Sequence, residues 1–266
     1  MSELYNTALK LRHLVRHHYA VFFRKVRPYP PFFLWVLVLY LMYEQPPVNI
    51  VQGYLSATMF LFFIIVAFGY LFLSDFDTVT EHLLILQINS RFLYGMSKII
   101  FLVAMTAAFS AVGAVVPAAF EIVSGITGSE FIPGGVRVVD FFGGFVLHFI
   151  VGTLGVAVAF IFQPSPSSGR GSEIMITVLA LFAIMAFVKH AVFGFDGVLR
   201  YVLLIFTPVY EIMSLFSDSA VFAIGDLALA AVYGGIYFAV AVAVGYWLYE
   251  KRVYGPRIAK MKKASG

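Results

Sequence analysis

The stretch QPPVNIVQGYLSATMFLFFIIVAFGYLFLS, residues 45–74, contains no charged side chain. A helix needs about 20 apolar residues to cross the hydrocarbon core of a bilayer, and this stretch exceeds that length. Three other parts of the chain, residues 99–120, 141–169 and 227–249, also lack Asp, Glu, Lys and Arg. The four segments predict an all-α integral membrane protein.

The composition supports a membrane protein and excludes several classes of site. Of the 266 residues, 61% are apolar and 12% are charged, whereas soluble domains carry roughly 25% charged residues. Cysteine is absent, which excludes disulfides, thiolate zinc sites and cysteine nucleophiles. The net charge of +4 comes from residues near the two ends of the chain, so it does not indicate binding to nucleic acid.

The distribution of basic residues predicts the topology. Each end of the chain carries six of the 18 lysines and arginines, within residues 1–31 and 250–266. Basic segments stay on the cytoplasmic side, so we expect both termini there and an even number of crossings. Six helices fit, at about 30–48, 52–74, 92–120, 140–163, 174–193 and 224–249. Residues 201–210 are too short to span and contain Pro208, which favours a broken or re-entrant hairpin over 200–220.

Residues 1–28 are expected to form an amphipathic helix on the cytoplasmic membrane surface. At 100° per residue one face carries Leu4, Ala8, Leu11, Val15, Tyr19, Phe22 and Val26, and the other carries Lys10, Arg12, His13, Arg16, His17 and Arg24. His18 and Lys25 interrupt the apolar stripe. The i,i+4 spacing of His13 and His17 suits a metal, but without an acidic or thiolate partner we predict a solvated basic face. We expect a transmembrane domain over 29–250 and a basic cytoplasmic tail over 251–266.

The loop between the second and third crossings predicts a short helix over residues 79–88. Thr78 and Glu81 have the spacing of a capping box, and Asn89 and Ser90 follow as caps for the next helix. We expect this helix to lie parallel to the membrane. A plain surface helix between two crossings is the alternative reading.

This arrangement resembles the permease subunits of ATP-binding-cassette transporters, specifically the ABC type-2 (type V) exporter class. The resemblance rests on the N-terminal amphipathic helix, the six-span layout and a degenerate loop pattern, which comprises Thr78, Glu81, Leu83, Leu84, Leu86, Ser90, Arg91 and Lys98. Asn89 stands where the family often has proline. The resemblance implies that 79–88 is the coupling helix that docks on the ATPase, and that 200–220 is the external hairpin before the last helix.

The resemblance also implies partners for this chain. No Gly-x-x-x-x-Gly-Lys-Ser/Thr phosphate loop occurs in the sequence, so ATP and magnesium are expected on a separate cytoplasmic ATPase subunit. We expect no catalytic, cofactor-binding or metal-binding residue here, and therefore no enzyme activity of the chain alone. A second copy or a paralogue would complete the permease in the inner membrane of a prokaryote, in contact with membrane lipids.

Small and polar residues mark candidate positions within the spans. Small-residue spacing predicts close helix contacts, in the bundle or at a dimer seam, at Gly144, Gly152, Ala231, Gly235, Ala239 and Ala243. His148 lies deep in a span, where it either bonds to a neighbouring helix or lines a polar path. Glu211, in the expected hairpin, could meet a polar group of a substrate.

The predicted function is ATP-driven export of a hydrophobic or amphipathic molecule such as a peptide, toxin, drug or lipid. An ion- or proton-coupled secondary transporter is the alternative, although that class commonly has internal repeats and midplane carboxylates. An intramembrane enzyme is disfavoured because the sequence lacks His-Glu-x-x-His, a Gly-x-Ser-x-Gly-like nucleophile and clustered aspartates.

Overall fold

Every regular element of the described residues is an α-helix. The structure, a computed structural model, describes residues 2–43, 49–75, 78–127, 132, 135–163, 209–217, 219 and 221–264. The all-α prediction is therefore confirmed for this part of the chain.

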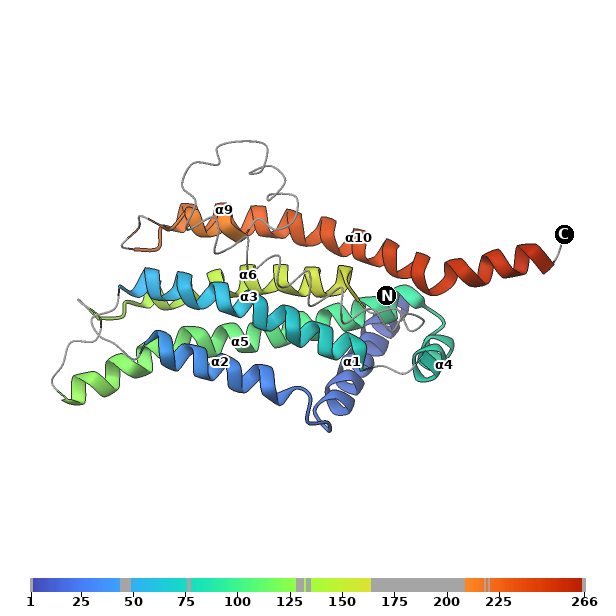
Figure 1. Ribbon diagram of the computed structural model, residues 1–266, viewed down its shortest axis with the longest axis horizontal. Helices are drawn as coiled ribbons and strands as arrows, with labels where there is room; N and C mark the ends of the chain where they lie inside the picture. The colour runs from blue at the N-terminus through green and yellow to red at the C-terminus, as the bar shows by residue number, and fades with distance from the viewer. Residues whose placement is uncertain are drawn as a thin grey trace.

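Four helices are long and apolar enough to cross a membrane: α3 (Ile50–Ser74), α5 (Arg91–Thr127), α6 (Val138–Ile161) and α10 (Ile224–Ala264). They run side by side, together with the shorter α2 (Tyr29–Met42), to form an elongated bundle (Figure 1). A multi-pass membrane protein, as the charge-free segments predict, is thus confirmed.

The structure does not show the six predicted crossings. The first was expected over residues 30–48, but α2 ends at Met42 and has 14 residues, a length of about 21 Å against a hydrocarbon core of about 30 Å. The fifth, over 174–193, lies outside the described residues. So does most of the predicted hairpin at 200–220, of which the helix α9 (Val209–Ser214) is described.

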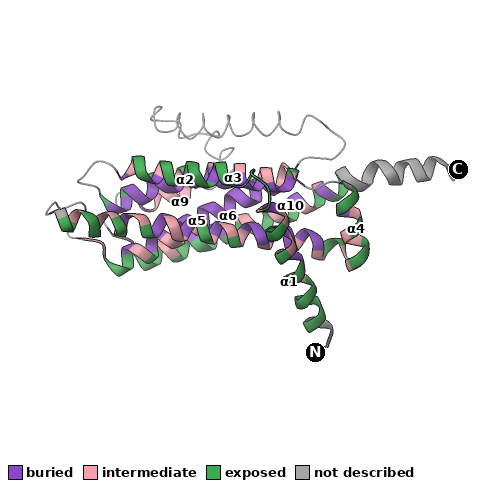
Figure 2. Cartoon of the chain, turned by 90° about the horizontal axis from the view of Figure 1, so that it is seen from below, coloured by how far each residue is buried: buried purple, intermediate pink, exposed green. Residues whose placement is uncertain are grey.

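Helix α6 forms the centre of the bundle and packs against α3, α5 and α10. In its most apolar window 78% of the residues are buried, against 11% for α10. Figure 2 shows the buried residues gathered inside the bundle. Glycine lets its neighbours approach closely: a Cβ at Gly144 would meet the Tyr54 ring at 2.5 Å, and one at Gly152 would meet Thr106 Cγ2 at 2.5 Å. Both predicted packing glycines therefore lie at helix contacts.

The small residues of α10 lie on two sides of the helix. Ala230 and Gly234 are buried, and a Cβ at Gly234 would meet Ile150 Cγ2 of α6 at 2.4 Å. The predicted ribbon lies on the exposed side, at Ala231, Gly235, Ala239 and Ala243. The face of α10 that carries Ala230 and Gly234 thus contacts α6. The helix continues through the predicted tail to Ala264.

Helices α1 (Ser2–Phe22) and α4 (Thr78–Ile88) lie at the same end of the bundle (Figure 1). α1 buries Leu14, His18 and Phe22 and packs against α5. This corrects the predicted stripe: Tyr19 is 56% exposed, whereas His18, which was expected to interrupt the apolar face, is 0% exposed. Packing on protein, rather than amphipathic periodicity alone, sets the buried face of α1.

Candidate functional site at the α4 end of the bundle

The boundaries of α4 follow from local sequence. Asn89 has a positive φ of 55°, a left-handed conformation that asparagine tolerates well and that commonly ends helices. The Ser90 hydroxyl oxygen then accepts a hydrogen bond from the Leu93 N–H at 3.3 Å. The predicted cap at the start of α5 is therefore confirmed for Ser90, whereas Asn89 ends α4.

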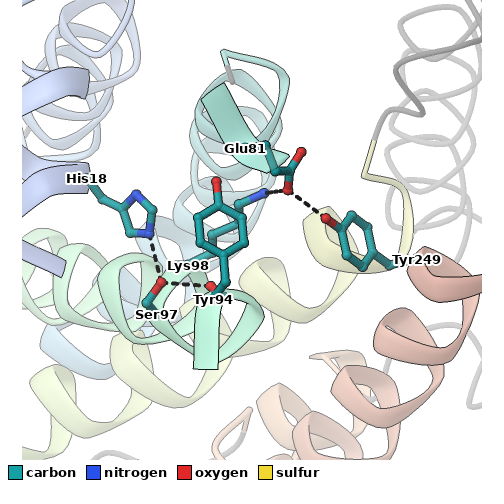
Figure 3. Close-up of polar contacts among 6 residues, drawn as sticks. All are labelled: His18, Glu81, Tyr94, Ser97, Lys98 and Tyr249. Carbon is teal, nitrogen blue, oxygen red and sulfur yellow. Dashed lines mark hydrogen bonds and ion pairs between the residues drawn. The ribbon is translucent and has the colours of Figure 1, made fainter. Parts of the chain in front are cut away.

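A buried ion pair joins α4 to α5. Lys98 Nζ donates to Glu81 Oε1 at 2.7 Å, with the two side chains 2% and 7% exposed. Tyr249 of α10 donates its hydroxyl to the same oxygen at 2.6 Å (Figure 3). The ammonium also lies 4.6 Å from the centre of the Tyr94 ring, a favourable position for a cation. Three helices thus meet at one carboxylate.

These contacts change the interpretation of Glu81. The capping-box pattern assigned it a local role at the start of α4, but its carboxylate makes tertiary contacts with partners 17 and 168 residues away. The position of Lys98 in the next helix does not by itself indicate that it pairs with Glu81. The loop pattern did contain Lys98, yet spacing could not show that the two side chains meet.

His18 extends this cluster to α1. Its Nε2 lies 2.8 Å from the Ser97 hydroxyl, which donates to the Tyr94 carbonyl at 2.7 Å (Figure 3). Because the single hydroxyl proton is used there, Nε2–H of a neutral imidazole is the donor to Ser97. Burial, helped by the nearby charge of Lys98, lowers the pKa of His18 from 6.5 to about 3. We name Glu81, Lys98, Tyr249, Tyr94, Ser97 and His18 the polar junction.

The opposite side of α4 carries exposed apolar side chains. Val79, Leu83 and Leu86 are 64%, 56% and 75% exposed, and their i, i+4, i+7 spacing places them in one stripe. We name these three residues the outer stripe. Leu84, which was predicted to dock with Leu83 and Leu86, is half-buried, and Arg91 is exposed. The side chain of Thr78 lies outside the described part of the structure. Val79 was not singled out from the sequence, although its helical spacing could have indicated it.

A further contact fixes the turn between α1 and α2. Asp75, at the end of α3, pairs with Lys25 at 2.7 Å and with Arg27 at 3.0 Å. Its carboxylate is 6% exposed, while the side chains of the two cations are 44% and 57% exposed. The pairs hold the α1–α2 turn against the end of α3.

The middle of the bundle contains a second polar cluster around His148, which is 0% exposed. Its Nδ1 lies 2.7 Å from the Gly144 carbonyl, so Nδ1–H is the donor. Trp35 Nε1 donates to the Phe109 carbonyl of α5 at 3.1 Å, and Tyr54 donates to the Ala114 carbonyl at 3.1 Å. Sequence reasoning missed Trp35 and Tyr54, since aromatic residues are common throughout the chain.

At the end of the bundle opposite α4, Glu121, Arg137 and Asp140 bind backbone or side-chain groups that lie nearby in the sequence. Glu121 accepts from the Ile132 N–H at 2.9 Å, and Arg137 pairs with Asp140 at 2.9 Å at the start of α6. Glu211, predicted as a polar substrate contact, lies in α9 and is half-buried. In the described part of the chain, no three His, Asp or Glu residues are grouped so as to hold a metal ion.

Comparison of the chain with known protein families, curated proteins and solved structures finds no match.

Proposed function

We propose that this chain is the membrane-spanning permease subunit of an ATP-driven exporter, and that α4 docks on a separate ATPase subunit. The supporting observation is the outer stripe of α4, which a buried ion pair holds away from the bundle. Exposed apolar side chains at helical spacing suit an apolar groove on a partner protein.

The size of the stripe is sufficient for specific docking. Fully burying a leucine or valine side chain is worth roughly 1.5–3 kcal/mol. Leu83 and Leu86 are 56% and 75% exposed, so burying the rest of both side chains is worth about 2 kcal/mol or more, which is about thirtyfold or more in affinity. The half-buried Leu84 has less surface left to contribute, so Leu83 and Leu86 are the main expected contacts.

The partner supplies the energy in this proposal. ATP and magnesium bind the ATPase subunit, because this sequence has no phosphate loop. A second copy or paralogue of the chain completes the permease, and the exposed ribbon of α10 is available for that contact. The α4 end, which also holds the basic α1, faces the cytoplasm of a prokaryote by the positive-inside rule.

Transport then follows from movement of α4. Closure of two ATPase subunits on ATP pushes the α4 helices, and the spanning helices rock to open a central path outward. The cargo class is a hydrophobic or amphipathic molecule such as a peptide, toxin, drug or lipid.

Purification of the chain from its native membranes in mild detergent tests the proposal. A P-loop subunit, identified by mass spectrometry, should copurify together with ATP hydrolysis. Leu83→Asp with Leu86→Asp should weaken ATPase binding by about thirtyfold or more, so that little of the ATPase is recovered. Gln87→Glu, which adds charge beside the stripe at an exposed position, is the matched control and should retain binding.

Two outcomes would contradict the proposal. If the double aspartate variant keeps both the ATPase and its export activity, α4 is only a surface connector. If export in sealed vesicles follows an ion or proton gradient and needs no ATP, the secondary-transporter alternative is correct.

A further inference from the structure

We propose that Lys98 and Tyr249 are positioning residues that link α4 to α5 and α10, so that α4 and α10 move together. The proposal rests on the proposed function only in giving α4 a docking role. The link itself consists of the contacts of Lys98 and Tyr249 with Glu81 in the polar junction.

The junction explains why the outer stripe faces outward. Glu81 is two residues from both Val79 and Leu83, which is about 200° around an α-helix. A contact that draws Glu81 into the bundle therefore turns the stripe to the opposite side. With Glu81 5% exposed and Val79 and Leu83 more than half exposed, the structure has this arrangement.

The two donors to Glu81 come from different spanning helices. Lys98 belongs to α5 and brings a full charge with 2% side-chain exposure, so separation of α4 from α5 would strand a buried ammonium. Tyr249 belongs to α10 and contributes one hydrogen bond to the charged oxygen. The α5 link is therefore the strong anchor, and the α10 link is the weaker one.

This difference assigns separate tasks to the two residues. Lys98 fixes the position of α4 relative to α5. Tyr249 couples a movement of α4 to α10. A push on α4 thus reaches α5 through the ion pair and α10 through the Tyr249 hydroxyl.

Distance measurements between paired spin labels test the link in the purified full-length chain, without any partner. The sequence contains no cysteine, so two introduced cysteines carry the only labels. Leu86→Cys with Glu250→Cys reports α4 against α10, and Leu86→Cys with Val115→Cys reports α4 against α5. All three positions are exposed.

Tyr249→Phe should broaden the 86–250 distances and leave the 86–115 distances unchanged. Loss of a hydrogen bond to a charged group should raise the ratio of separated to linked forms about tenfold or more. Lys98→Met should broaden both distributions, while Lys98→Arg, which keeps the charge, should preserve the 86–115 distances. Tyr233→Phe, at an exposed tyrosine of the same helix, is the matched control.

The proposal is overturned if Tyr249→Phe gives the same 86–250 distances as Tyr233→Phe. It is also overturned if Lys98→Met leaves both distributions narrow. Loss of ATPase binding with an intact distance response would refute the docking function and leave the link in place, so the two failures are distinguishable.

Discussion

The two buried polar clusters of the molecule follow different rules. Around His148, in the middle of the bundle, neutral donors bond to backbone carbonyls of α5 and α6. At the polar junction, a carboxylate on α4 meets an ammonium on α5. The first cluster lies within the predicted spans, and the second lies where α4 meets α5 and α10.

The difference shows where this fold depends on particular partners. A helix carbonyl already accepts a backbone hydrogen bond, so loss of a Trp35 or Tyr54 donor leaves no buried group unsatisfied. Glu81 and Lys98 instead carry full charges, and each is the ionic partner of the other. Removal of one side chain therefore leaves the charge of the other buried without an ionic partner.

The largest effect is expected for Lys98→Met, which leaves Glu81 as a buried charge. Loss of one partner of such a pair typically costs about 3–5 kcal/mol. The double variant Lys98→Met, Glu81→Leu should recover most of this loss, because no charge is left buried. Denaturant unfolding in detergent, followed by tryptophan fluorescence, measures both. Equal stability of the two variants would contradict the stranded-charge explanation.

A smaller effect is expected from overpacking at the helix contacts. Gly152→Val places side-chain atoms against Thr106 Cγ2, which lies 2.5 Å from an added Cβ, and should cost about 1–3 kcal/mol. Gly235→Ala, on the exposed side of α10, should be neutral or gain up to about 1 kcal/mol from helix propensity. Thermal unfolding in detergent compares them. If Gly235→Ala destabilised the protein, the added methyl group would have to meet another group on the exposed side of α10.

The polar junction should also respond to pH through His18. Because burial lowers the pKa of His18 from 6.5 to about 3, the unfolded chain binds a proton that the folded chain does not. The contribution of neutral His18 to the free energy of unfolding is therefore fully present above about pH 6.5. It is lost progressively as the pH falls toward about 3. Between about pH 7 and pH 5.5 the loss should be about 1 kcal/mol.

Unfolding measured at both pH values checks this prediction. His18→Phe should reduce the pH dependence by that amount, and His13→Phe, at an exposed position of α1, should not. An unchanged pH dependence in His18→Phe would show that α1 does not depend on a neutral imidazole.

The smallest effect is expected for Tyr54→Phe in the middle of the bundle. It removes only the hydroxyl that donates to the Ala114 carbonyl, an acceptor that keeps its place in the α5 helix, so the cost should be about 0.5–1 kcal/mol. Chemical denaturation followed by circular dichroism provides the comparison with Lys98→Met. A cost as large as that of Lys98→Met would remove the distinction between the two clusters.

The sequence determined the features that depend on neighbouring residues. Long charge-free stretches specify α3, α5, α6 and α10, because a bilayer selects apolar helices of sufficient length. The loop pattern specified α4 to within one residue, and Ser90 caps α5 as predicted. Each of these features arises within a few turns of chain.

Only the tertiary structure decided which distant groups meet. Glu81 bonds to Tyr249 across 168 residues, His18 is buried although it interrupts an amphipathic stripe, and the α10 ribbon faces outward beside the face that packs on α6. Periodicity assigns residues to a face of a helix, but it does not specify what that face contacts. In a bundle whose helices are apolar on nearly every side, the contacts are set by the fit of small and large side chains between helices.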